Sequence, residues 1–193
     1  MDIVSIVLLM LSSVFLGYTY IRSVQPLRLA NKGVKDAFES CRRSRSLSGL
    51  GETLVFLSYI LYTVSGMTVL GVFSSDLWIP LTVGLIFVLS GGVFMVAGIK
   101  AAGKETMTPG AASELFKGIY DHIRHPQTTG TVLIWVGTAF MLNRVDLLVH
   151  AVLLSCVYGV ATILEERDLV LRFKDDYRTY QSRTGRFLPK IRH

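Results

Sequence analysis

Long apolar runs are the feature that most restricts what this 193-residue chain can fold into. Such runs occupy residues 3–21, 53–73, 77–99 and 147–164, and each is long enough to cross the roughly 30 Å hydrocarbon core as an α-helix. A shorter run, 131–142, spans the core only if its helix begins earlier in the chain. Charged residues make up only 18% of the chain, against roughly 25% in soluble domains. The pattern predicts an all-α, polytopic membrane protein with about five transmembrane helices.

The basic residues are distributed unevenly between the segments that separate these runs. They gather at 22–45, at 100–124 and beyond residue 165, and Arg144 is the one Lys or Arg elsewhere. The positive-inside rule assigns such segments to the cytoplasm, which predicts an outside N-terminus and a cytoplasmic C-terminus. The net charge of +6 is therefore explained by topology, and it does not favour nucleic-acid binding.

Two polar segments have their own predicted structure. Residues 22–51 are basic and are expected to form a loop, part of which lies along the lipid headgroups. Pro26 prevents the first helix from continuing into this segment. Beyond Glu165, apolar residues recur at helical spacing as far as a natural stop at Gly185, which predicts an amphipathic helix.

The polar stretch 118–130 carries ionisable groups at close spacing between strongly apolar segments. Ser113 is expected to cap a short helix that enters this stretch. Pro126 biases His125 away from α geometry, so Arg124 and His125 are expected on a bent segment at the membrane surface. A guanidinium offers a fixed fork of donors to a carboxylate or phosphate. An interfacial basic anchor with a proline kink is an equally good interpretation of these residues.

Glu165 and Glu166 close the last apolar run, where adjacent carboxylates are costly unless they are paired or face water. Neighbours on a helix point about 100° apart, so one carboxylate can pair with Arg124 while the other meets a ligand. The alternative is a solvated charge pair at a helix end. The histidines lack the spacing of a catalytic metal site, so no metal is predicted.

Several motifs follow one another between residues 115 and 189. They are Gly-x-Tyr, Arg-His-Pro with a glycine four residues after the proline, the Glu-Glu pair, and a Tyr-x-x-Tyr-x-x-Arg tail ending in Phe-x-Pro. Their order and spacing resemble the isoprenylcysteine carboxyl methyltransferase family of integral membrane enzymes, and the chain looks like a compact prokaryotic member. Thr128 stands where this family usually has a tyrosine, which affects the shape of the expected pocket.

This resemblance implies a function and a set of site residues. The family transfers the methyl group of S-adenosylmethionine, bound from the cytosol without a Rossmann domain, to the carboxylate of a prenylated cysteine. Catalytic roles would be taken by Arg124, Glu165 and Glu166. The expected cofactor-binding residues are Leu115, Tyr120, His125, Pro126, Gln127 and Glu165.

The expected organisation is a single domain over 1–193, with a three-helix membrane scaffold at 1–100 and a cytoplasmic-face catalytic and cofactor-binding region at 112–193. A lipid-like or prenylated acceptor would enter from the bilayer, and Arg124 or Arg172 could supply the counter-charge for its carboxylate.

Two alternatives to this function stay open. A phospholipid or other lipid amine methyltransferase would use the same cofactor, but its acceptor would have to lose a proton, so its activity should rise with pH. A non-catalytic membrane scaffold or partner subunit belongs to another class, and it would bind no cofactor.

Overall fold

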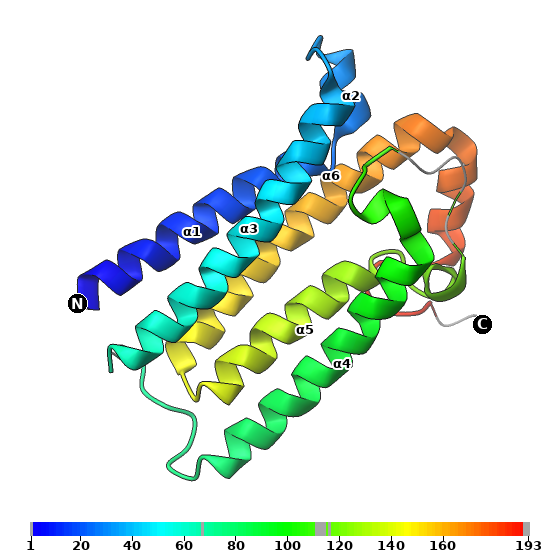
Figure 1. Cartoon of the computed structure of the whole chain (residues 1–193). Helices are drawn as coiled ribbons and strands as arrows, with labels where there is room; N and C mark the ends of the chain where they lie inside the picture. Colours follow the sequence, from blue (N-terminus) through cyan, green and yellow to red (C-terminus); the bar gives the residue numbers. More distant parts are fainter. Residues whose placement is uncertain (1, 67, 111–114, 116, 191–193) are drawn as a thin grey trace.

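The computed structural model describes residues 2–66, 68–110, 115 and 117–190. Its elements are α1 (Asp2–Ser23), α2 (Pro26–Asn31), α3 (Ala37–Val64), α4 (Trp78–Ala102), η1 (Gly103–Thr106), η2 (Gly118–Asp121), α5 (Pro126–Met141) and α6 (Val145–Arg183). Figure 1 shows the five long helices side by side in an elongated bundle. Within the described residues, α1, α3, α4 and α6 are long and apolar enough to cross a membrane. The prediction of an all-α polytopic membrane protein is confirmed.

Helix α5 is shorter than the helices around it. Its 16 residues span about 24 Å, less than the roughly 30 Å hydrocarbon core. It begins at Pro126, whose missing N–H costs nothing at the first position of a helix. Because α5 packs against both α4 and α6, it lies inside the bundle and needs no full crossing of its own to be stable.

The prediction of a loop over 22–51 is wrong beyond residue 36, because α3 begins at Ala37 and continues for 28 residues. Its first turn is charged but is supported locally. Glu39 pairs with Arg42 at 2.7 Å and with Arg43 at 3.1 Å, at the three- and four-residue spacings that stabilise a helix. The basic residues of this segment therefore extend the end of a transmembrane helix.

Other predicted boundaries have mixed outcomes. The first helix does not continue past Pro26, as expected, because α1 ends at Ser23 and α2 begins at Pro26. The second apolar run ends as a helix at Val64, well before residue 73, and Gly66 follows in a left-handed conformation with φ of 75°. Ser113, the expected helix cap, lies outside the described residues.

Glycines spaced seven residues apart bring α4 and α5 into backbone contact. A Cβ atom added at Gly91 would lie 2.6 Å from the carbonyl oxygen of Gly130, and one at Gly84 would lie 2.5 Å from that of Gly137. Small residues are the usual means of close helix packing in membranes, where burial of apolar surface between helices gives little driving force. At Gly98 the added atom would be 2.7 Å from Cγ of Gln127, so the contact continues to the first turn of α5.

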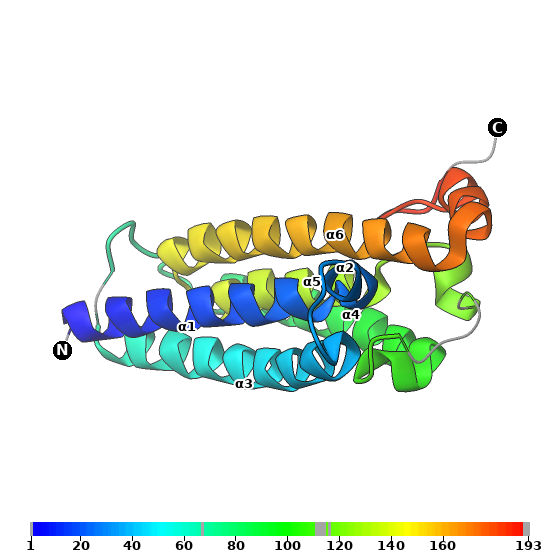
Figure 2. The same ribbon diagram turned by 90° about the horizontal axis from the view of Figure 1, so that it is seen from above.

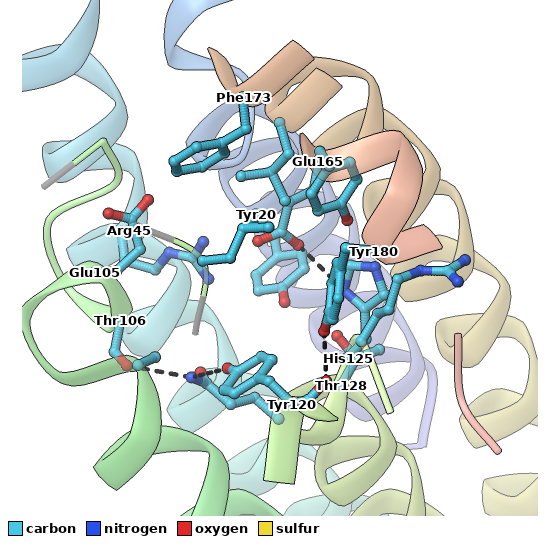
Figure 3. Close-up of a pocket in the computed structure, with 16 residues that line it drawn as sticks. Tyr20, Arg45, Glu105, Thr106, Tyr120, His125, Thr128, Glu165, Phe173 and Tyr180 are labelled. Carbon is cyan, nitrogen blue, oxygen red and sulfur yellow. Dashed lines mark hydrogen bonds and ion pairs between the residues drawn. The ribbon is translucent and has the colours of Figure 1, made fainter. Parts of the chain in front are cut away.

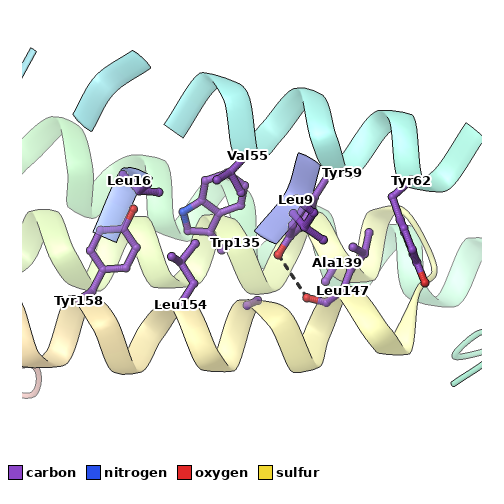
Figure 4. Packing of buried hydrophobic residues seen from close by; sticks show 11 residues of the cluster. Leu9, Leu16, Val55, Tyr59, Tyr62, Trp135, Ala139, Leu147, Leu154 and Tyr158 are labelled. Atoms are coloured by element: carbon purple, nitrogen blue, oxygen red, sulfur yellow. Dashed lines mark hydrogen bonds between the residues drawn. The ribbon is translucent and has the colours of Figure 1, made fainter. Parts of the chain in front are cut away.

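The buried core joins α1, α3, α5 and α6 (Figure 4). Tyr59 and Trp135 meet edge to face with ring centroids 5.3 Å apart, and the Tyr59 hydroxyl donates to the carbonyl oxygen of Leu147 at 3.2 Å. The ring of His150 lies within hydrogen-bond distance of both Tyr59, at 2.9 Å, and Ser13, at 2.8 Å. The polar contacts among them connect α1, α3 and α6 inside the bilayer, where an unpaired polar group is costly.

Helix α6 is 39 residues long, about 58 Å, and changes direction at Lys174. That residue has non-helical angles, with φ of 49° and ψ of −123°. Figure 2 shows the turns after this kink bending away from the axis of α6, at the end of the bundle opposite the first turns of α1. The kink therefore brings the C-terminal part of α6 over the residues that precede α5.

Candidate active site

A cleft lies at the end of the bundle where α4 ends and α5 begins (Figure 3). The empty space between its walls is about 680 Å³ with the open solvent at its mouth included. It is narrow, because the centre of a water molecule can move through only about 60 Å³ of it. Its walls come from α1, α3, α4, η1, η2, α5 and α6, so the whole bundle contributes to it.

One wall is built around Tyr120 in η2. The amide nitrogen of Gln127 donates to the Tyr120 hydroxyl at 3.1 Å and to the Thr106 hydroxyl at 3.2 Å. The backbone carbonyl of Tyr120 accepts a hydrogen bond of 2.6 Å from the hydroxyl of Tyr180, which lies beyond the kink of α6. Burial and the nearby charge of Glu165 raise the pKa of the Tyr120 phenol, so it is neutral at physiological pH.

Glu166 is the centre of a buried ion cluster behind this wall. Its side chain is only 5% exposed. Arg124 donates to it at 2.9 Å, Arg186 at 2.6 and 3.1 Å, and the amide of Gln181 at 3.2 Å. His125 lies 3.1 Å from the same carboxylate. A buried carboxylate with this many donors is fully paired, and the cluster is therefore a structural element as well as a charged one.

The C-terminal tail reaches Glu166 through a backbone pairing. Ile123 and Gly185 form a parallel bridge, in which the Arg124 N–H donates to the Gly185 carbonyl at 2.8 Å and the His125 N–H to the Arg186 carbonyl at 3.1 Å. The Arg124 guanidinium also donates to the carbonyls of Gln181, at 3.2 Å, and of Thr184. Arg124 thus holds the end of α6 as well as its partner Glu166.

Glu165 differs from its neighbour in its surroundings. Its side chain is 32% exposed and lines the cleft, whereas Glu166 does not line it. The ring of His125 lies between the two carboxylates, with Nδ1 3.5 Å from Glu165 and Nε2 3.1 Å from Glu166. Burial alone would lower the pKa of His125, but its hydrogen bonds and charge interactions with the two glutamates outweigh burial and raise it. The two carboxylates thus favour the protonated form of His125, whose ring links the buried cluster to the cleft.

Most of the residues expected at the site are brought together here. Leu115, Tyr120, Arg124, His125, Gln127 and Glu165 all line the cleft. Pro126 is buried at the start of α5 and does not line it. Arg172, expected as a counter-charge for a substrate, pairs instead with Glu105 at 2.8 Å. Arg124 is likewise occupied by Glu166, so the structure leaves neither arginine in the role of an unpaired counter-charge.

Sequence reasoning missed several residues of the site. Tyr20 and Arg45 line the cleft from α1 and α3, and Phe173 lines it from α6. Arg186, which makes the shortest contact with Glu166, was also missed, although it lies inside the recognised tail motif. A signal for Arg45 was the cluster of basic residues before the second run, but helix packing decides which of them faces the cleft.

A second, apolar groove lies between α5 and α6. It has an empty volume of about 590 Å³, open solvent included, and is lined by Thr128, Thr129, Val132, Leu133, Ser155, Gly159 and Phe187. Thr128 lines both this groove and the cleft. The small side chain at this position therefore separates a polar site from an apolar one.

Comparison with known proteins places the chain in a family. A family model described as phospholipid methyltransferase matches residues 79–175, half of the chain. The chain belongs to the phospholipid methyltransferase family. The match to this family begins in α4 and ends just beyond the kink of α6, so it contains both Tyr120 and the Glu165–Glu166 pair.

The chain is also similar to a curated protein, the methanethiol S-methyltransferase of Pseudomonas deceptionensis. It is 36% identical over 74 residues, which are 38% of this chain and 28% of the relative. The chain thus covers less than a third of that protein's length. No solved structure matches the chain.

Proposed function

We propose that this protein transfers a methyl group from S-adenosylmethionine to an amphipathic acceptor at the cytoplasmic membrane face, and that the acceptor group is the carboxylate of an isoprenylcysteine-like compound. The observation that carries the proposal is the different surroundings of two adjacent carboxylates. Glu166 is paired with the cations of the buried cluster, while Glu165 lines a cleft with aromatic walls. Membership of a methyltransferase family supports the same reaction class.

The orientation follows from charge. Among the described residues, every Lys and Arg except Arg144 lies at or beyond the cleft end of the bundle or on the segments joined to it. The positive-inside rule favours the cytoplasm for that end. A cofactor made in the cytosol would then reach the cleft directly, and the acceptor would come from the bilayer.

The donor groups in the cleft fit such a cofactor. An adenosine can stack on the aromatic rings of Tyr20, Tyr120 and Phe173, and Gln127 is positioned to hold its polar edge. The carboxylate of Glu165 suits the positive end of the cofactor, its ammonium and sulfonium groups. When bound, the cofactor supplies a methyl group on a positively charged sulfur, which is already activated for transfer.

The chain's own residues then have to hold the two reactants and exclude water. The raised pKa values of Tyr120 and His125 bear on the acceptor, because neither a neutral phenol nor an imidazolium can act as a base. A carboxylate is ionised at neutral pH and needs no base to attack the methyl group. Together with the positive charge of Arg45, which forms no ion pair among the described residues, this favours an anionic acceptor over an ammonium group.

The apolar part of the acceptor has a place beside the cleft. The groove between α5 and α6 is lined by aliphatic side chains and by Phe187, and it shares Thr128 with the cleft. We infer that a prenyl-like tail occupies this groove while its polar end reaches past Thr128.

A lipid amine is the second candidate acceptor, and the family description favours it. The name of the Pseudomonas relative gives methanethiol as its acceptor. A thiol of this kind is an anion when it is deprotonated to the thiolate, so it would also meet the requirement for an anionic acceptor. A non-catalytic scaffold is the remaining alternative, and the discriminating observation is whether the cofactor binds.

The test is methyl transfer from radiolabelled S-adenosylmethionine by the purified full chain in detergent. The acceptors are N-acetyl-S-farnesylcysteine, phosphatidylethanolamine and ethanethiol, each assayed between pH 6 and pH 9. We expect transfer to the farnesylcysteine carboxylate without a steep rise with pH. Transfer to phosphatidylethanolamine alone, rising with pH, would replace the carboxylate by an amine, and failure of S-adenosylhomocysteine to bind would refute the methyltransferase assignment.

A further inference from the structure

We propose that Arg45, on the third turn of α3, binds a carboxylate group of a ligand in the cleft. This inference rests on the proposed function and adds a residue to it. Arg45 lies outside residues 79–175, the part of the chain that the family model matches. It belongs to the half of the chain that was expected to serve only as a membrane scaffold.

The guanidinium of Arg45 forms no hydrogen bond or ion pair with the residues that the structure describes. Its Nε atom is buried and has no hydrogen-bond partner there. Its guanidinium carbon lies 5.1 Å from the centre of the Tyr20 ring, which holds the group in place without using its N–H donors. A buried, unsatisfied charged donor is costly, so a group of this kind is expected to be completed by a ligand.

The acidic residues near Arg45 have other partners. Glu52, on the same helix, accepts a hydrogen bond of 3.1 Å from the Tyr158 hydroxyl. Glu105 is paired with Arg172 at 2.8 Å, and Glu165 lies beside His125. Within the described part of the chain no ion pair to Arg45 is formed, although Figure 3 shows its side chain in the same cleft as Glu165.

The other cations at the cleft are occupied. Arg124 is held by Glu166, and His125 lies between the two glutamates of α6. Arg45 is therefore the cleft-lining cation with donors to spare. A guanidinium presents its N–H groups in a planar fork that matches a carboxylate, and this pair is among the strongest hydrogen-bonded pairs in proteins.

Two ligands could bring the carboxylate. One is the cofactor, whose amino-acid end carries both a carboxylate for Arg45 and an ammonium group for Glu165. The other is the acceptor, whose carboxylate would be oriented by Arg45 toward the methyl group. The chemistry at Arg45 is the same in both cases, and paired ligands with and without the carboxylate separate them.

The experiment measures dissociation constants by calorimetry for the full chain in detergent and for its Arg45→Gln variant. The first ligand pair is S-adenosylhomocysteine and 5′-methylthioadenosine, which lacks the amino-acid end. The second pair, added to protein saturated with S-adenosylhomocysteine, is N-acetyl-S-farnesylcysteine and its carboxamide. Arg43→Gln is the matched control, because Arg43 lies on the same helix with a side chain that is 76% exposed.

We expect Arg45→Gln to raise the dissociation constant of the carboxylate-bearing ligand of one pair by between about 10-fold and 150-fold, the factor for losing a charge-assisted hydrogen bond. The partner without the carboxylate should change by less than about twofold, and Arg43→Gln should change neither. Arg45→Lys, which keeps the charge but not the fork, should fall between wild type and Arg45→Gln. If affinity is lost only in the first pair, the carboxylate bound by Arg45 is that of the cofactor. If affinity is lost only in the second pair, it is that of the acceptor.

Other results overturn the proposal. An equal loss for both members of each pair means that Arg45 only supports the fold, and unchanged binding of all four ligands means that it binds no carboxylate. Apparent melting temperatures of each variant separate weak binding from misfolding. If the wild-type protein binds no S-adenosylhomocysteine, the proposed function fails and this inference fails with it, whereas normal wild-type binding with no effect of Arg45→Gln refutes this inference alone.

Discussion

Two adjacent glycines of α4 allow the packing of α4 on α5 to be measured directly. A Cβ atom at Gly91 would lie 2.6 Å from the Gly130 carbonyl oxygen and 3.0 Å from the Ile134 backbone nitrogen. A Cβ atom at Gly92 would have no heavy atom within 4 Å. The same substitution, Gly→Ala, is therefore forbidden by a backbone contact at one position and free at the next.

The expected magnitude follows from two terms. Alanine is favoured over glycine in a helix interior by up to about 1 kcal/mol, and this gain is shared by both variants. Overpacking costs about 1–3 kcal/mol, and at Gly91 it cannot be relieved by rotating a side chain because the nearest atom is the backbone oxygen of Gly130. The difference in stability between Gly91→Ala and Gly92→Ala should therefore be about 1–3 kcal/mol, because the propensity term cancels.

The assay is thermal unfolding of both variants in the same detergent. For a chain of this length, 1 kcal/mol corresponds to about 2–4 °C, so Gly91→Ala should melt between about 2 and 12 °C below Gly92→Ala. Gly84→Ala, with its Cβ 2.5 Å from the Gly137 oxygen, should behave like Gly91→Ala. Equal melting temperatures for Gly91→Ala and Gly92→Ala would mean that α4 and α5 are not in backbone contact, and the placement of Gln127 at the cleft would lose its support.

Two further predictions concern the site. Because the folded protein raises the pKa of His125, the protonated ring stabilises the fold below the unfolded histidine pKa of about 6.5, and this stabilisation disappears as pH rises through the folded value. The apparent Tm of the wild type should therefore fall more between pH 6 and pH 9 than that of His125→Gln, and parallel pH profiles would contradict a cationic His125. Gly185→Ala would place a Cβ atom against the Leu188 carbonyl oxygen, so it should displace the tail that carries Arg186, a partner of Glu166, and weaken S-adenosylhomocysteine binding by about tenfold or more. Gly49→Ala, which meets no atom within 4 Å, is its control, and equal binding by the two variants would show that the tail does not support the cleft.

Part of the site could be predicted because its residues are close in sequence. Tyr120, Arg124, His125 and Gln127 occupy one short segment ahead of α5, and a proline at its end sets their local geometry. The expectation was that one of the two adjacent glutamates pairs with an arginine while the other meets a ligand, and the pairing is confirmed by the bond from Arg124 to Glu166. That Glu165 meets a cofactor stays a prediction.

Other parts could not be predicted, because they depend on contacts between distant segments. The basic residues after the first run were expected in a loop, since charged sequence at a membrane surface is compatible with either a loop or an extended helix. The division into a scaffold over 1–100 and a catalytic region over 112–193 stays a prediction. Two cleft-lining residues, Tyr20 and Arg45, come from the first of these parts.

By itself the sequence determined the membrane class, the helical spans, the break at Pro26 and the segregation of charge, because hydrocarbon thickness and backbone hydrogen bonding allow few solutions to long apolar runs. The tertiary structure alone decided which carboxylate faces the cleft, that Arg186 completes the buried cluster, and that Arg45 lies in the cleft with donors free. Those outcomes depend on the rotation of α3 and α6 about their axes and on the kink at Lys174. The rotations and the kink are set by packing between residues that are far apart in the sequence, so no local sequence pattern predicts them.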